Sequence, residues 1–244
     1  MHSLTYYKES LKISEDQTVY KKLRQQIQPF RGIRGIPFSV IAKELDEEYT
    51  VTLPEQSEEL YSLFLQSFEE GLIAIGILSV AALSQPENSW ELVQRWLPMI
   101  DDVITSDAIG KIVIGPCALQ LNLDIPNLIS EYENVYAKRA LYMSLCAFVP
   151  SPPIGPWVSA LRSHLQSEQI IFIEKPITHH YEHLFSQFLK MEIPLLRKAI
   201  VHLVQLWSTF DLLSIDKKIQ NHPQNLPNWL KKSYEKGRRQ HNKT

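Results

Sequence analysis

The chain has 244 residues, of which 44% are hydrophobic, 10% aromatic and 21% charged. This is the composition of a globular protein, and it excludes a disordered or collagen-like chain. With 25 basic and 27 acidic residues the formal net charge is -2, so the bulk charge offers no argument for a nucleic-acid partner. Two cysteines cannot form a disulfide framework and indicate a reducing compartment, so we expect a cytoplasmic protein.

The expected elements are helical along nearly the whole chain. Val19, Leu23 and Ile27 are spaced four apart, and Pro37 can open a helix over residues 38–49. Further helices are expected over residues 58–68, 69–83, 89–97, 100–114, 125–132, 135–148, 157–165, 177–189, 193–210, 212–219 and 226–236. Pro116 is expected to break the chain after the helix over residues 100–114, and the short β-branched stretches 49–53 and 170–173 are interpreted as loops or helix ends.

Some dozen helices joined by short proline-punctuated turns favour an all-α fold, a superhelical solenoid of antiparallel helix pairs with HEAT-like repeats. No hydrophilic linker divides the chain, so we expect one domain over residues 1–244, ending in a basic and flexible tail at 231–244. The longest apolar run, residues 72–83, is too short for a bilayer, which needs about 20 residues. We therefore expect no membrane partner.

Charge is unevenly distributed along the sequence. Residues 43–59 hold seven acids and one base, whereas residues 231–244 hold six bases and one acid. The plain interpretation is a solvated acidic helix and a frayed basic end. The alternative is a molecule whose bases gather on one surface, which a net charge near zero would conceal.

Three aspartates begin and occupy the helix expected over residues 100–114. Asp101 or Asp102 would serve as its N-cap or as a first-turn acid. Asp107 lies a turn and a half further on, where no cap is needed, so its carboxylate is a candidate for stabilising positive charge in a groove. A solvated helix face is the simpler alternative for Asp107.

Other reactive residue types suggest no metal or covalent chemistry. His179 and His183 share an i, i+4 spacing, but with His180 they lack the additional ligands of a zinc site. Cys117 and Cys146 have no histidine partner and are expected to be buried. We therefore expect no metal and no cofactor.

Two bases share a local context. Arg139 and Lys198 each stand near the start of an apolar helix, directly before an alanine. On two stacked hairpins they could hold successive phosphates of a nucleic acid. The alternative is that each side chain simply extends from a helix surface toward solvent.

Four segments in order resemble the DNA alkylation repair glycosylases of the HEAT-like repeat type. They are FRGIRGIPFSVIAKEL, WLPMIDDVITSDAIGKIVIG, ENVYAKRALYMSL and LLRKAIVHLVQLW, within roughly residues 18–210. The resemblance implies a glycosylase that hydrolyses the N-glycosidic bond of cationic N3- or N7-alkylpurines in duplex DNA, as a monomer. A carboxylate would stabilise the sugar cation without a metal.

Residue by residue, the resemblance assigns catalysis to Asp107. It places Asp102, Tyr136, His202 and Trp207 near the lesion, at or close to positions where the family has aromatic residues. The phosphate-binding bases it implies are Lys111, Lys138, Arg139, Arg197 and Lys198. Two alternatives stay open: a DNA-binding protein of the same fold without catalysis, or a HEAT-like scaffold for protein–protein interactions.

Overall fold

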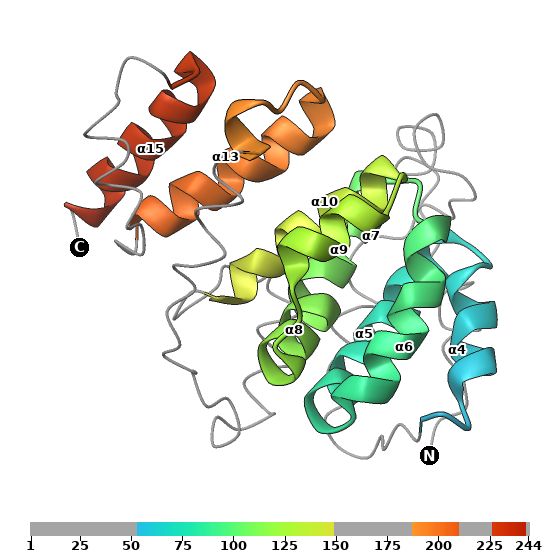
Figure 1. The fold of residues 1–244 in the computed structure, drawn as a ribbon. Coiled ribbons are helices and arrows are strands. Elements are labelled where there is room, and N and C mark those ends of the chain that lie inside the picture. The colour runs from blue at the N-terminus through green and yellow to red at the C-terminus, as the bar shows by residue number, and fades with distance from the viewer. Residues whose placement is uncertain (1–52, 149–186, 210–225, 243–244) are drawn as a thin grey trace, which may run out of the picture.

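The computed structural model describes residues 53–148, 187–209 and 226–242, and every regular element in these ranges is helical (Figure 1). The described part of the protein is therefore all-α, as expected. The helices are α4 Ser57–Phe64, α5 Phe68–Ser84, α6 Pro86–Trp96, α7 Val103–Ile109, α8 Gly115–Leu121, α9 Ile125–Glu131, α10 Val135–Ser144, α13 Pro194–Thr209 and α15 Asn228–His241. Three tighter or wider helical turns accompany them: η1 Leu97–Met99 after α6, the π-helical η2 Gly110–Ile114 between α7 and α8, and η3 Leu145–Phe148 after α10.

Several expectations lie outside the described residues. They are the helices before residue 53, those at 157–165 and 212–219, most of 177–189, the β-branched stretch 170–173 and all but the last residue of the stretch 49–53, and the His179, His180 and His183 group. The amino-terminal segment of the glycosylase resemblance, FRGIRGIPFSVIAKEL, also lies there.

Helix α5 is buried on almost every side, as its nearly continuous apolar sequence predicts. Ser67 caps it by accepting a hydrogen bond from the Glu70 backbone N–H. Helix α4 packs on one side of α5 and helix α6 packs on another. Between α4 and α6 the rings of Phe64 and Trp96 stack with their centroids 4.4 Å apart, so the three helices form one compact layer of the core.

The predicted break at Pro116 is wrong, because one continuous helical segment runs from α7 through η2 into α8. Pro116 lies in the first turn of α8, directly after the π-helical turn. In that turn the Gly115 N–H donates to the Gly110 carbonyl five residues back. The wider turn shifts the hydrogen-bond ladder just where proline lacks its N–H, which lets the segment continue to Leu121.

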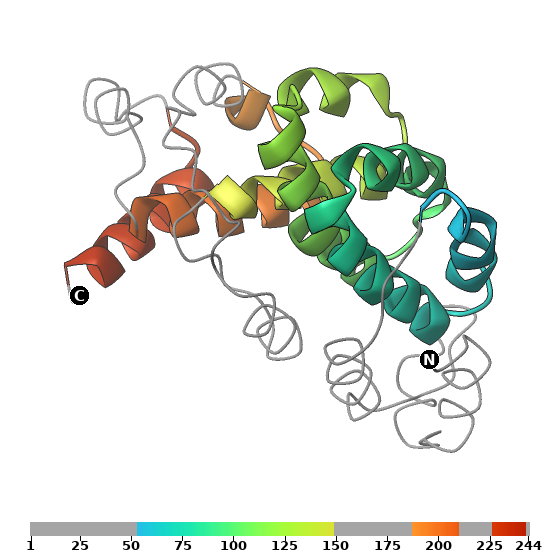
Figure 2. The same ribbon diagram turned by 90° about the horizontal axis from the view of Figure 1, so that it is seen from below.

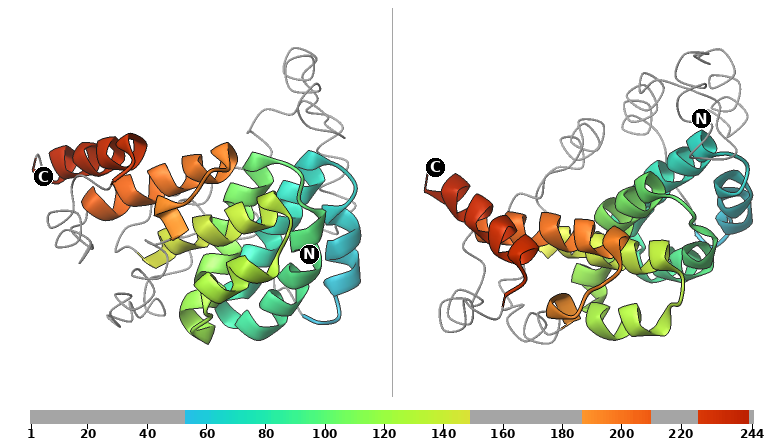
Figure 3. Two further views of the ribbon diagram at one scale, coloured as in Figure 1. Left: turned by 45° about the horizontal axis from the view of Figure 1, so that its top comes forward. Right: turned by 90° about the horizontal axis from the view of Figure 1, so that it is seen from above.

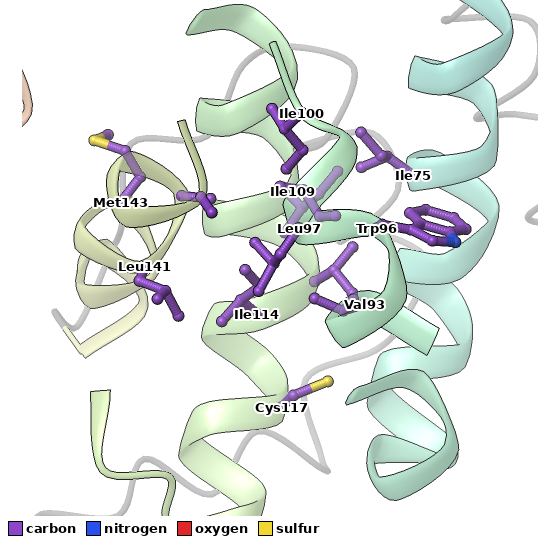
Figure 4. Packing of buried hydrophobic residues seen from close by; sticks show 14 of the residues in the cluster. Ile75, Val93, Trp96, Leu97, Ile100, Ile109, Ile114, Cys117, Leu141 and Met143 are labelled. Carbon is purple, nitrogen blue, oxygen red and sulfur yellow. The ribbon is translucent and has the colours of Figure 1, made fainter. Parts of the chain in front are cut away.

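Gly110 lets this segment approach α10 closely. A Cβ at Gly110 would collide with the carbonyl oxygen of Ala140 and touch the Met143 side chain. This close approach brings the side chains of α7 near those of α10. In Figure 4, Val93, Leu97 and Ile114 point toward one another in the adjoining apolar core.

Helix α4 lies at one end of the molecule and α15 at the other (Figure 3). Helix α10 contacts α7 on one side and α13 on the other, and α13 packs in turn against α15. In Figure 2 the α13–α15 pair extends away from the larger group of helices. The basic segment expected to be a flexible tail is instead helical as far as His241.

Candidate functional site

The short helix α7 is started by Asp102. Its Oδ1 accepts hydrogen bonds from the backbone N–H groups of Ile104 at 2.7 Å and Thr105 at 2.8 Å. The Asp102 side chain is buried, and its capping role is one of the two interpretations that the sequence left open. The carboxylate satisfies donors at the end of the helix and so positions the residues that follow.

Asp107 lies on the last turns of α7 and forms an ion pair with Arg139 of α10. Arg139 donates from Nε to Asp107 Oδ1 at 2.7 Å and from Nη2 to Oδ2 at 2.9 Å. The side chain of Asp107 is 28% exposed and that of Arg139 only 7%. The planar guanidinium matches the carboxylate with two parallel bonds, so both Asp107 oxygens are fixed in direction while one edge of the group still reaches solvent.

The third donor group of Arg139 also bonds within the protein. Nη1 donates to the carbonyl oxygen of Leu195, in the first turn of α13, at 2.8 Å. The guanidinium thus connects α7, α10 and α13, and the sequence expectation that it holds a phosphate is replaced here by internal bonding. The reason is burial, because a guanidinium that is 7% exposed requires partners in the protein.

His202 on α13 and Lys111 on η2 are electrostatically coupled to this pair. Burial lowers the pKa of His202 below its ordinary value, and the positive charges of Lys111 and Arg139 lower it further, while Asp107 opposes them. Its Nε2 is buried and makes no hydrogen bond. The imidazole is therefore neutral at pH 7, and Asp107, Lys111, Arg139 and His202, all singled out from the sequence, lie in one electrostatic neighbourhood.

The remaining expected DNA contacts differ in how far they reach solvent. Lys198 is exposed on α13, and Lys138 on α10 is half-buried. Arg197 donates from Nε to the Met191 carbonyl at 2.5 Å, and its guanidinium lies 6.0 Å from the ring centroid of Trp229. Lys111 and Arg197 are half-buried like Lys138, so Lys198 is the one fully exposed cation of this group.

The two aromatic residues assigned to the lesion have different environments. Tyr136 is half-buried at the start of α10 and packs against the core. Trp207 is fully buried, with its ring centroid 6.2 Å from that of Phe188. Trp207 lies on the core-facing stripe of α13 with Leu203 and Val204, so its ring forms part of the hydrophobic core instead of a surface.

The sequence analysis overlooked Asn134, whose side chain connects the segment before α7 to the start of α10. Its Oδ1 caps α10 by accepting from the Tyr136 and Ala137 N–H groups, and its Nδ2 donates to the carbonyls of Pro98 and Ile100 at 3.0 and 2.9 Å. It thereby ties the segment before α7 to the start of α10. Asparagine directly before an apolar helix was the available signal for the cap.

A separate cavity of about 130 Å³ lies beside the start of α7, and Asp107 is not among its lining residues. Phe64, Phe68, Met99 and Asp101 line it with six others. Burial, followed by the nearby charge of Asp102, raises the pKa of Asp101 above its ordinary value. The carboxylate of Asp107 therefore faces solvent elsewhere than in this cavity.

Burial of both thiols removes them from consideration as nucleophiles. It raises the pKa of Cys117 and of Cys146 to about 12. Across residues 53–148, 187–209 and 226–242, no three His, Cys, Asp or Glu side chains are grouped so that they could hold a metal ion. In the same ranges, every helix is too short or too polar to cross a bilayer.

Comparison with protein-family models, with curated proteins and with solved structures found no match to this chain. The function therefore has to be argued from the Asp107–Arg139 pair and its surroundings.

Proposed function

We propose that this protein binds duplex DNA and excises cationic N3- or N7-alkylpurines by hydrolysing their N-glycosidic bond. The observation that carries the proposal is the Asp107 carboxylate, 28% exposed and held by both oxygens to the buried Arg139. A carboxylate of fixed direction at the surface of a helical protein is suited to stabilising positive charge that develops outside the protein. The fold within this proposal is a solenoid of HEAT-like repeats.

The chemistry requires little beyond such a carboxylate. When the C1′–N bond breaks, the electron pair moves to the purine, whose alkylation-derived charge is thereby neutralised. The deoxyribose becomes an oxocarbenium-like cation, which Asp107 stabilises while water adds at C1′ and loses a proton. The purine leaves as a neutral base, so no general acid, metal or cofactor is needed.

The surrounding bases supply the phosphate contacts of the proposal. Lys111, Lys138, Arg197 and Lys198 lie on η2, α10 and α13, the segments that surround or adjoin Asp107. Tyr136, at the start of α10, offers the ring that would contact the lesion, and neutral His202 lies within the electrostatic influence of Asp107. The protein acts as a monomer in this proposal.

The decisive assay measures free 7-methylguanine and 3-methyladenine released from methylated duplex DNA. Wild-type protein is expected to release base, and Asp107→Asn is expected to reduce the rate at least tenfold because the charge on the carboxylate is lost. Asp124→Asn is the matched control, since Asp124 is an exposed N-cap of α9 and asparagine caps equally well. Absence of release by the wild type would overturn the catalytic proposal.

Two observations favour a second candidate, a DNA-binding protein without catalysis. Arg139 neutralises Asp107 at contact distance, and Trp207 is enclosed in the core where it cannot hold a cationic base. This candidate predicts DNA affinity that falls steeply with salt, unchanged by Asp107→Asn, and no released base.

A further inference from the structure

Helix α15 is amphipathic and exposes a row of cations. Its sequence, NWLKKSYEKGRRQH, contains five bases and one acid. Lys231, Lys232, Lys236 and Arg239 are exposed, and we call these four residues the α15 cationic face. At 100° per residue they lie within about 140° of one another around the helix, so they share one side of it.

The opposite side of α15 is packed firmly against α13. Leu230 is fully buried, and the Ser233 hydroxyl donates to the Val201 carbonyl of α13. Gly237 lies so close to α13 that a Cβ there would collide with the Gln205 carbonyl. The cationic face is thus displayed on a helix whose position is set by close packing.

The dimensions and charge of the face suit a row of phosphates. Lys231 and Arg239 are eight residues apart, which at 1.5 Å per residue is about 12 Å along the helix. One DNA strand carries a phosphate about every 3.4 Å of helix axis, so this length covers three to four phosphates. Glu235, the one acid of α15, is half-buried, so the exposed charge of the face is dominated by cations.

The chemistry of α15 favours a nucleic acid over an anionic membrane. A helix that binds at a membrane interface inserts a free apolar face among the lipids. On α15 Leu230 is instead fully buried, Trp229 and Tyr234 are half-buried against the core, and none of its side chains is among the large exposed hydrophobic ones in the described ranges. A polyanion that needs only charge, and no apolar insertion, is the partner that this face fits.

We infer that the α15 cationic face binds the phosphodiester backbone of duplex DNA without reading its sequence. The inference rests on the DNA partner of the proposed function but not on its chemistry. It adds to the contacts around Asp107 a second binding surface on α15, which packs against α13, while α13 in turn contacts α10 (Figure 1).

The test measures binding of the full chain to a fluorescent DNA duplex of random sequence as a function of salt. A variant with Lys231→Gln, Lys232→Gln, Lys236→Gln and Arg239→Gln is compared with wild type. Each lost phosphate contact makes the negative slope of log K against log salt shallower by about 0.9. Arg239→Gln alone has a matched control in Arg95→Gln, at an exposed arginine of α6 near the other end of the molecule. Thermal unfolding by circular dichroism verifies that the variants are folded.

We expect the quadruple variant (the fourfold variant below) to have a slope shallower than that of wild type by about 3 to 4, and Arg239→Gln a slope shallower by about 1. Arg95→Gln should match wild type. Unchanged slopes in the folded variants, or no binding of wild type to duplex DNA, would overturn the inference. Binding of wild type to phosphatidylserine vesicles that the fourfold variant loses, with DNA binding unchanged, would overturn it in favour of a membrane. Base release from methylated DNA is measured in parallel, so that loss of the chemical proposal and loss of this surface are separate results.

Discussion

Arg139 on α10 holds both carboxylate oxygens of Asp107 on α7, across 32 positions of sequence, with its Nε at 2.7 Å and its Nη2 at 2.9 Å. Its remaining Nη1 reaches the Leu195 carbonyl of α13. One buried side chain thus joins three helices at the residue on which the proposed chemistry depends. If the proposed function holds, variants at this point should change both stability and activity, and each change can be measured.

Arg139→Met is expected to lower the free energy of unfolding by about 3 kcal/mol, because the partly buried Asp107 carboxylate loses its partner. The value is at the low end of the range for buried pairs, since Asp107 is 28% exposed and water can reach it. Urea unfolding measures the change. In the Asp107→Leu, Arg139→Met double variant much of the loss should be regained, and strictly additive costs would show that the pair is not coupled.

Asn134→Ala should cost about 2 kcal/mol, about half from the lost α10 cap and half from the two lost bonds to Pro98 and Ile100. Asn134→Asp separates these roles, because aspartate keeps the capping oxygen but has no Nδ2 donor. We expect Asn134→Asp to cost about half as much in thermal or urea unfolding. Equal costs for the two variants would mean that the bonds to the segment before α7 carry the whole effect.

Stability should fall as the pH drops below about 6.5 because of His202. Its pKa is lowered in the folded protein by burial and by Lys111 and Arg139, so the unfolded chain binds the proton first. Stability is therefore complete above the ordinary histidine pKa and is lost as the pH falls toward the folded-state value. The slope of unfolding free energy between pH 5 and pH 7 should be smaller in His202→Gln. Identical slopes would exclude His202 as its source.

Both thiols should be inert in the folded protein. Cys117 and Cys146 are buried, and their pKa values of about 12 leave about one thiol in 10,000 ionised at pH 8. A thiol reagent such as dithionitrobenzoate should label neither residue at pH 8 in buffer and both of them in guanidinium chloride. Rapid labelling of the native protein would show that the core around η2, η3 and α8 opens readily.

Local sequence signals were sufficient for most helices and for the cap of α7. The periodicity of residues 135–148 and 193–210 predicted α10 and α13 closely, because an amphipathic helix carries its pattern within a few turns. Asp102 was one of two acids predicted as the cap, since capping depends on the next three residues only. The break predicted at Pro116 was wrong because a π-helical turn, which has no clear signature in the local sequence, lets the helical segment continue past the proline.

The sequence predicted the residues of the candidate site but not how they are arranged in space. Asp107 and Arg139 were both singled out, yet their ion pair was missed because a contact between residues 32 positions apart produces no periodic pattern in the sequence. Trp207 was assigned to a lesion from its place in a motif, whereas the orientation of α13 against its neighbours directs that ring into the core.

The near-neutral charge, the helical periodicity and the caps belong to the sequence by itself, since composition and local propensity act over a turn or two. They determined an all-helical protein with acids early and bases late in the chain. Only the tertiary structure decided which charges are enclosed and which face solvent: Arg139 is bound inside against Asp107, while Lys231, Lys232, Lys236 and Arg239 are displayed on α15. The physical reason is that burial depends on how helices pack, and a charge taken out of water must find a partner there.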